Sequence, residues 1–303
     1  MEKLPERIVP ESSEATLRPI SSGAEKWLYR PIKCLNHGFI YLVDYMGNDT
    51  SVVEAARVSY GRGTKKVSED RGLIRYLRRH VHTTPLEMVE FKFHCKMPIF
   101  VARQWIRHRT ANVNEYSGRY SVMSNEFYLP EPSALAKQSQ GNRQGRGESL
   151  SPQVQQKVLE LLKAEYISQY AVYENLLKFD LARELARIGL SVANYTEWYW
   201  KIDVHNLLHF LRLRLDKHAQ YEIRVYGEAM ARIIKDALPT TFEAFEDYQL
   251  HAMNLSRLEI EFIKDHSWPM ESVAASCEIL KQFKNKRETE EFVEKLKNLN
   301  LVK

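Results

Sequence analysis

Cysteine is scarce in this chain, with three among 303 residues, at positions 34, 95 and 277. Their odd number and wide spacing argue against a disulfide framework or a cysteine-based metal site, and they favour a reducing compartment. No run of eighteen apolar residues occurs, so we expect no transmembrane helix and no membrane partner. Residues 1–19 are polar and lack an apolar core. We therefore expect no secretory signal and a cytoplasmic location.

The glycine-rich fingerprints of nucleotide-binding loops are also missing from the sequence. Any bound nucleotide would be held by side chains and loop amides, and arginine suits phosphate through its planar fork. The 44 basic residues exceed the 39 acidic residues only slightly, giving a net charge of +5. This mild excess is compatible with an anionic small substrate and with nucleic acid. A hydrophobic content of 44% and a charged content of 27% fit a soluble globular protein of one large domain or two modest ones.

The hydrophobic periodicity predicts an α+β fold, with a central mixed or antiparallel sheet and a helix-rich second half. The clearest strand is 87–97, where Val89, Phe91, Phe93, Cys95 and Met97 alternate with polar or exposed positions. The other expected elements of the first half are a strand over 38–46, a helix over 52–60 with Thr50 as its N-cap, a basic helix over 69–80, and a helix over 99–108 that Pro98 begins.

Helices dominate the predicted second half, after a segment at 131–152 that is rich in Gln, Ser, Gly and Arg and is expected to be a mobile surface insertion. We predict helices over 153–178, 180–190, 203–236 and 255–300, and an aromatic-rich segment over 194–200. The expected organisation is an N-terminal arm over 1–37, a catalytic domain over 38–250 and a helical extension over 251–303.

Residues 107–119 concentrate three arginines, a histidine, a carboxylate and a serine directly after an apolar segment. Guanidinium groups that leave water need an anionic partner, so the cluster favours an anion-binding site. A solvated basic loop or a nucleic-acid patch is the competing interpretation. Gln104 and Arg107 lie three residues apart and would share a helix face beside this cluster.

Arg214 lies in an apolar helical pattern and has no acidic residue three or four positions away, whereas Arg212 has Asp216. A buried Arg214 would therefore need a distant acid or a ligand, and the pattern leaves both open. His80 and His82 lie two residues apart, but no further ligands stand at zinc-site spacing, so we predict no metal.

Five blocks in consistent order resemble the flavin-dependent thymidylate synthase family. They are Glu54–Gly61, His82–Glu87, Gln104–Arg119, Ala186–Ile188 and Leu213–Ile223, and together they span roughly residues 38–247. The resemblance implies that family's fold and a homotetramer with FAD at the subunit interfaces. It also implies synthesis of dTMP from dUMP, with methylenetetrahydrofolate and NADPH as co-substrates and no nucleic acid as partner.

The resemblance also implies roles for individual residues. Arg214 would be the catalytic residue, placed at the uracil, where its charge favours an anionic ring at N3. The residues implied to bind dUMP are Gln104, Arg107, Ser117, Gly118, Arg119, Arg187 and Arg214. Those implied to contact FAD are Thr84, Arg107, His108, Arg109, Glu115, Asp203 and His209, the last two standing where many relatives carry Asn, and His82 would lie near the flavin and folate.

Two alternatives remain. The chain could be a flavin- and nucleotide-binding protein with altered activity, or a basic nucleic-acid-binding protein. Cysteine bears on the choice, because the other class of thymidylate synthase uses a cysteine nucleophile. Cys95 lies on the apolar face of its predicted strand, and neither Cys34 nor Cys277 has a catalytic context, which fits a flavin mechanism.

Overall fold

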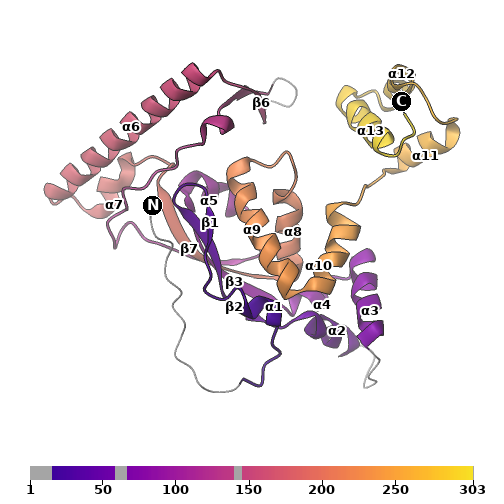
Figure 1. Cartoon of the computed structure of the whole chain (residues 1–303), viewed down its shortest axis with the longest axis horizontal. Coiled ribbons are helices and arrows are strands. Elements are labelled where there is room, and N and C mark those ends of the chain that lie inside the picture. Colours follow the sequence, from indigo (N-terminus) through magenta and orange to yellow (C-terminus); the bar gives the residue numbers. More distant parts are fainter. Residues whose placement is uncertain (1–15, 59–66, 140–144, 303) are drawn as a thin grey trace. The chain divides into compact units, whose positions relative to one another are not determined.

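A five-stranded antiparallel sheet, in the order β1-β2-β3-β7-β4, organises the first of two units in the computed structural model (Figure 1). The structure describes residues 16–58, 67–139 and 145–302, and the units divide between Phe245 and Glu246. The strands are β1 (Ile32–Cys34), β2 (Gly38–Met46), β3 (Glu90–Pro98), β7 (Tyr195–Asp203) and β4 (Asn112–Glu115). This sheet and its helices confirm the predicted α+β fold, and β2 has the predicted bounds.

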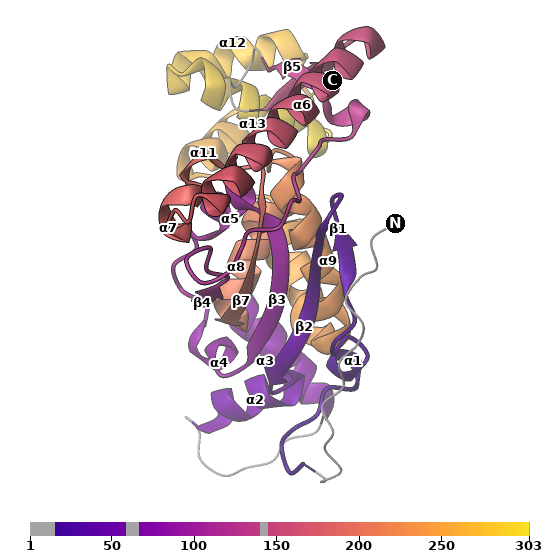
Figure 2. The same ribbon diagram turned by 90° about the vertical axis from the view of Figure 1, so that its left-hand side faces the viewer.

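One face of the sheet forms the core beneath three helices. Phe91, Phe93, Cys95 and Met97 of β3 are all fully buried, which confirms the predicted alternation. Helices α5 (Ile99–Trp105), α8 (Val204–Arg214) and α9 (Tyr221–Ala237) pack on the sheet, and Figure 2 shows α8 and α9 behind the strands. The strand begins at Glu90 rather than 87, because residues Thr84–Glu87 form the short helix α4, with a proline in its first turn.

The helices of the first half depart from prediction at their ends. Helix α2 (Asp49–Arg57) is capped by Asn48, whose side chain accepts the Ser51 N–H at 3.1 Å. The predicted Thr50 cap is therefore wrong, and the predicted helix end at Tyr60 lies outside the described residues. Helix α5 ends at Trp105, three residues earlier than predicted, which leaves the arginine cluster on a loop. The remaining helices here are α1 (Ser22–Glu25) and α3 (Val67–Arg79).

The described parts of residues 131–152 have regular structure. A 3-10 turn, η2 (Pro132–Ala134), precedes a hairpin of β5 (Ala136–Gln138) and β6 (Arg146–Ser149), while 140–144 lie outside the described residues. The expected mobility of this segment stays a prediction. The described part of the N-terminal arm predicted over 1–37 contains helix α1 and strand β1, which pairs with β2 at the edge of the sheet.

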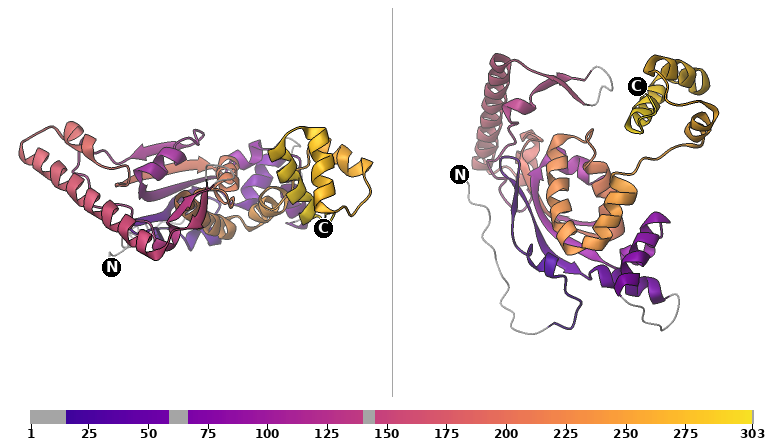
Figure 3. Two further views of the ribbon diagram at one scale, coloured as in Figure 1. Left: turned by 90° about the horizontal axis from the view of Figure 1, so that it is seen from above. Right: turned by 45° about the vertical axis from the view of Figure 1, so that its right-hand side comes forward.

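A long helix, α6 (Pro152–Lys178), follows the hairpin and confirms the helix predicted over 153–178. Figure 3 shows it as one uninterrupted rod. Tyr170 and Tyr173 attach it to a small apolar cluster that includes Met123 and Phe127. In place of the single helix predicted over 180–190, α7 (Arg183–Ala186) passes into the 3-10 turn η3 (Arg187–Gly189).

The helix predicted over 203–236 is two helices, α8 and α9, separated by residues 215–220. The reason lies in Asp216, whose carboxylate accepts the backbone N–H of His218 at 2.7 Å and so competes with the helical hydrogen-bond pattern. Helix α9 ends at Ala237, and Pro239 opens the next helix, α10 (Pro239–Phe245), because proline is tolerated in a first helical turn.

The second unit, Glu246–Lys303, has its own core. After the π-turn η4 (Glu246–Leu250), helices α11 (Arg257–Asp265), α12 (Ser272–Phe283) and α13 (Lys286–Asn298) bury Phe262, Ile279, Phe292 and Leu296. This agrees with the predicted helical character of 255–300. Among the described residues, no helix is both long and apolar enough to cross a membrane.

Candidate active site

Trp105, the last residue of α5, fixes the start of the arginine-rich loop. Its indole is fully buried, stacks on Phe210 of α8 at 5.1 Å between ring centroids, and meets Trp198 and Trp200 of β7 edge-on. Aromatic contacts of this kind add to the stabilisation from buried area. The loop that follows therefore leaves the core at a defined point, next to the C-terminal half of α8.

The first group of predicted site residues gathers where α8 ends, and it consists of Gln104, His108 and Arg214. The Arg214 guanidinium donates two hydrogen bonds to Nε2 of His108, from Nε at 3.2 Å and from Nη2 at 2.9 Å. Burial, the Arg214 charge and His209 lower the pKa of His108 to about 4. His108 is therefore neutral at physiological pH, which is what lets Nε2 accept from a cation.

Arg214 has no acidic partner among the described residues, although burial lowers its pKa. Gly227 of α9 lies directly against it, since a Cβ added at Gly227 would stand 3.3 Å from the Cβ of Arg214. The sequence also suggested an ion pair between Arg212 and Asp216. In the described residues Asp216 instead pairs with His218, at 2.9 Å. The sequence left two possible partners for Arg214, a distant acid or a ligand. The described part of the chain supplies no such acid.

A hydrogen-bond network connects Gln104 to the buried carboxylate of Glu222. The Gln104 side chain donates to Gln220, which in turn donates to the carboxylate of Glu222 at 2.9 Å. Glu222 is almost fully buried and also accepts from Arg146 of β6 and, at 2.7 Å, from the Tyr128 hydroxyl. Burial alone would raise the pKa of Glu222, but these hydrogen bonds outweigh it and hold the pKa below its ordinary value.

The second group consists of Ser117, Gly118, Arg119 and Arg187. Gly118 is buried beneath Arg187, since a Cβ added to it would stand 3.2 Å from Nη1 of that guanidinium and 2.9 Å from the sulfur of Met123. Arg119 pairs with Glu184 of α7 at 2.9 Å. Within the described residues, no hydrogen bond or ion pair joins this group to the first.

The residues expected at the flavin are dispersed over several elements. Arg107 and Arg109 are exposed, and their guanidinium groups make no hydrogen bond or ion pair with the described residues. Two exposed guanidinium forks on one loop suit the charge and geometry of a pyrophosphate. The carboxylate of Glu115 accepts from Thr196 at 2.7 Å, and the ring of His209 lies 6.2 Å from that of His108.

The remaining flavin candidates lie at helix starts or on the surface. Asp203 is the N-cap of α8 and accepts the Asn206 N–H at 2.9 Å, as expected for a negative charge at that position. Thr84 begins α4, which packs against α8, and is exposed. His82 is exposed, with its ring 5.7 Å from that of Tyr76.

Comparison with known proteins gives a consistent result. The family model described as thymidylate synthase complementing protein matches residues 41–240. The flavin-dependent thymidylate synthase of Rickettsia bellii (strain RML369-C) is 55% identical over 265 residues, which cover 83% of this chain and 90% of that protein. The protein of the same name from Gluconobacter oxydans (strain 621H) is 58% identical over 246 residues, which cover 80% of this chain and 81% of that protein.

This chain belongs to the flavin-dependent thymidylate synthase family.

Solved structures agree with that assignment. The crystal structure of a UMP/dUMP methylase, PolB from Streptomyces cacaoi bound with 5-Br dUMP, is 33% identical and superposes with a TM-score of 0.66. The match covers 72% of this chain and 99% of that one. The predicted fold of the flavin-dependent thymidylate synthase family is thereby confirmed.

Cysteine chemistry in this flavin-dependent thymidylate synthase family member agrees with the expectation from sequence. Cys34 and Cys95 are buried, and burial raises the pKa of each thiol above its ordinary value. A nucleophilic role requires a thiolate, and neither thiol is deprotonated at neutral pH. Cys277 belongs to the second unit and lies outside the family's blocks in the sequence.

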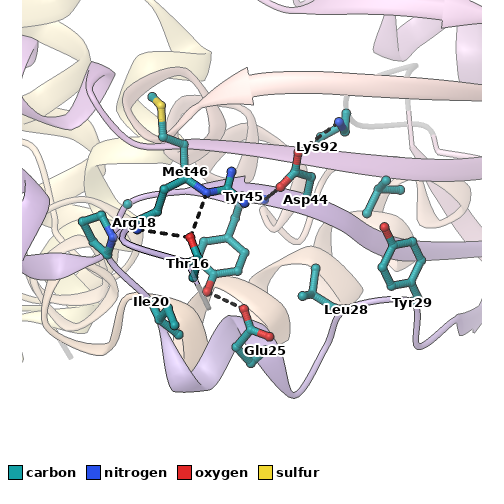
Figure 4. Close-up of a pocket in the computed structure, with 13 residues that line it drawn as sticks. Thr16, Arg18, Ile20, Glu25, Leu28, Tyr29, Asp44, Tyr45, Met46 and Lys92 are labelled. Atoms are coloured by element: carbon teal, nitrogen blue, oxygen red, sulfur yellow. Dashed lines mark hydrogen bonds and ion pairs between the residues drawn. The ribbon is translucent and has the colours of Figure 1, made fainter. Parts of the chain in front are cut away.

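A pocket of about 640 Å³ lies apart from these groups, between the N-terminal residues and β2 (Figure 4). None of the predicted site residues lines it. Its polar side chains engage one another, as Lys92 with Asp44 at 3.1 Å and Tyr45 with Glu25 at 2.7 Å. The pocket therefore offers no set of unengaged groups for the family's chemistry.

The structure adds residues to the first group that sequence reasoning did not assign. Gln220 and Glu222 stand within the block Leu213–Ile223, and their place in that block was the available signal. Arg146 had no such signal, because it lies in a segment whose composition is typical of a loop. Its partnership with the buried Glu222 depends on tertiary packing across 76 residues.

Proposed function

We propose that this chain methylates dUMP to dTMP, taking the one-carbon unit from methylenetetrahydrofolate and the reducing equivalents from NADPH through bound FAD. Membership of the flavin-dependent thymidylate synthase family supports the methylation and the flavin. The observation that carries the proposal for the site is the pairing of His108, four residues after Gln104, with Arg214 at the end of α8, whose guanidinium has no acidic partner among the described residues. Gln104 itself contacts Gln220, in the turn that follows α8.

Arg214 is the catalytic residue in this proposal. Neutral His108 holds its fork by accepting two N–H groups, and the guanidinium keeps further donors for a ligand. A fixed positive charge beside the uracil stabilises an anionic ring, which activates the ring carbons for bond formation. Gln104, itself held by Gln220, orients the same base or its sugar phosphate.

The flavin would be held by the unengaged guanidinium groups of Arg107 and Arg109, with Thr84, His108, Glu115, Asp203 and His209 as further contacts. Bound flavin supplies the hydride that converts the methylene group to methyl. His82, exposed on the loop before α4, would lie beside the folate.

The second group would complete the site from another protomer. Ser117, Gly118, Arg119 and Arg187 would bind the dUMP phosphate, for which two arginines and backbone N–H groups are suited. Since no hydrogen bond or ion pair of the described residues joins the two groups within one chain, we propose a homotetramer in which each site is shared between subunits.

Product analysis with the purified protein tests the reaction. Because NADPH supplies the two electrons that reduce methylene to methyl, the folate should leave as tetrahydrofolate and no dihydrofolate should form. We expect one dTMP per NADPH, with formation dependent on FAD. A folded, yellow protein that binds dUMP and makes no dTMP would instead favour the altered flavoprotein, and a colourless protein that binds polynucleotides in a salt-dependent manner would favour the nucleic-acid-binding alternative.

The Arg214→Lys variant tests the assigned catalytic residue. A point charge replaces a planar fork, so the two hydrogen bonds to His108 cannot both form. We expect dUMP binding to be kept and kcat to fall by about a hundredfold, the size typical for losing one preorganised electrostatic donor. Unchanged kcat in a folded, flavin-loaded variant would remove Arg214 from this role, and Arg212→Lys, two residues away on an exposed face, is the matched control.

A further inference from the structure

A second pocket, of about 830 Å³, opens between the β5–β6 hairpin and the turn that joins α8 to α9. Four basic side chains line it, Arg146, Lys217, His218 and Arg224, against one acidic side chain, Glu131. The lining also includes the hydroxyl-bearing residues Ser133, Ser139 and Ser149. Three of these basic side chains have acidic partners, which are Glu222 for Arg146, Asp216 for His218 and Glu228, at 3.4 Å, for Arg224. Their remaining N–H groups and the serine hydroxyls are the donors that suit an oxyanion.

The two arginines of this pocket are held in place before any ligand arrives. Their guanidinium carbons lie 6.0 Å (Arg146) and 5.9 Å (Arg224) from the centre of the Tyr221 ring. Arg146 also pairs with the buried carboxylate of Glu222, and Arg224 donates to the Lys217 carbonyl at 3.1 Å. Groups that are already ordered lose little conformational entropy when they bind a ligand.

The start of α9 adds to the positive potential. The helix has 17 residues, and its N-cap, Gln220, makes no side-chain cap hydrogen bond because its amide is engaged with Gln104 and Glu222. The positive end of the helix dipole therefore adjoins the pocket through Gln220 and Tyr221, while the buried carboxylate of Glu222 lies in the same first turn. Gln220 lines the pocket as well, so the pocket adjoins the first group of site residues.

We propose that this pocket binds the anionic part of a co-substrate of the same reaction. The shared chemistry is a multiply charged oxyanion on a small molecule, either the phosphate of the reduced nicotinamide nucleotide or the carboxylates of the folate's glutamyl chain. A volume of this order suits such a ligand. The inference rests on the proposed function, because it places a co-substrate beside Gln104.

A double variant, Lys217→Gln with Arg224→Gln, removes two of the charges and leaves Arg146 with its buried partner. The test compares two substrate preferences by kcat/KM at low salt: NADPH against NADH, and pentaglutamyl against monoglutamyl methylenetetrahydrofolate. We expect one preference to fall about tenfold, and its identity assigns the pocket to the phosphate or to the glutamyl carboxylates. Lys137→Gln is the matched control, since Lys137 lies on the same hairpin, pairs with Glu148 and does not line the pocket.

Binding without turnover separates this inference from the proposed function. Calorimetric titration of flavin-loaded protein with NADP+, which cannot reduce the flavin, and with pentaglutamyl tetrahydrofolate should show a tenfold weaker Kd for one of them in the double variant. If the double variant keeps both substrate preferences and both affinities, the pocket assignment is overturned. If the unaltered protein makes no dTMP, the proposed function alone is overturned. Lys217→Gln by itself, a change of an exposed side chain, carries the test where the double variant melts at a lower temperature.

Discussion

At the scale of single residues, the pair formed by His108 and Arg214 is the most consequential contact of the first group. Its strength depends on His108 remaining neutral, because a protonated imidazole has no lone pair to offer a guanidinium. Burial is the first cause of the low pKa and the neighbouring charge of Arg214 the second. The pair therefore links the placement of the Arg214 side chain, the proposed catalytic residue, to pH.

The sign of the pH effect follows from the direction of this shift. Between the ordinary pKa of 6.5 and about 4, the unfolded chain holds a proton on His108 that the folded chain does not. The unfolded state binds more protons in that window, so the free energy of unfolding should decrease as the pH falls from 6.5 to 4. Urea unfolding of flavin-free protein at several pH values checks this, and His108→Gln should lessen the decrease. An identical decrease in both proteins would show that His108 does not titrate in this window.

Gly118 gives a steric prediction for the second group. An added methyl group in Gly118→Ala would press on Met123 and Arg187, with Arg187 Cδ only 3.1 Å away. We expect displacement of that guanidinium to raise the KM for dUMP five- to tenfold, about 1 to 1.4 kcal/mol. Gly189→Ala is the control from the neighbouring turn, because nothing lies within 4 Å of its added Cβ. Equal KM values in the two variants would contradict the assignment of Gly118 and Arg187 to dUMP.

The residue scale also shows what the sequence could and could not predict. The absence of a local acid for Arg214 was visible from spacing alone, because helical neighbours are fixed at three and four residues. Its actual partner, His108, lies 106 residues away, and no local pattern encodes such a contact. The individual roles of the site residues stay predictions.

At the scale of elements, the apolar alternation of a strand with one buried face could be predicted from the sequence. The breaks between helices could not. The alternation of β3 follows from burial of one face, so period two appears directly in the sequence. The interruption between α8 and α9 depends on one carboxylate, that of Asp216, taking a backbone N–H in a stretch that otherwise keeps helical periodicity. The hairpin of 131–152 was missed because polar, glycine-containing strands lack an apolar alternation.

The cap of α8 provides the prediction at this scale. Asp203→Ala removes the acceptor of the Asn206 N–H and should lower the free energy of unfolding by about 1 kcal/mol. Asp203→Asn keeps a capping oxygen, so it should change the free energy of unfolding by only a few tenths of the loss expected for alanine. Denaturant unfolding of both variants is the measurement. A loss as large for asparagine as for alanine would mean that the charge of Asp203, rather than its capping oxygen, stabilises this helix.

At the scale of the whole molecule, the two units have separate cores, and all predicted site residues belong to the first. Phe292, fully buried in the second unit, packs against Phe262 and Phe283 at 5.7 and 5.6 Å between ring centroids. This arrangement predicts that the second unit can lose its packing while the first keeps the site.

Phe292→Ala should therefore destabilise Glu246–Lys303 by about 3 to 5 kcal/mol and leave dTMP formation nearly unchanged. Limited proteolysis followed by mass spectrometry locates the loosened segment, and kcat reports on the first unit. Leu299→Ala, an exposed position in the same unit, should have little effect on either. Parallel loss of activity and packing in Phe292→Ala would mean that the units unfold together.

The separation of the two groups of site residues has a genetic consequence. A chain altered only at Arg214 still carries an intact second group, and a chain altered only at Arg187 still carries an intact first group. In an assembly that shares its sites, two such alleles, each unable to sustain thymidylate synthesis alone, would complement each other when expressed in one cell. Mixed assemblies of either allele with a functional copy would keep active sites in proportion to the functional chains, so neither allele would be dominant.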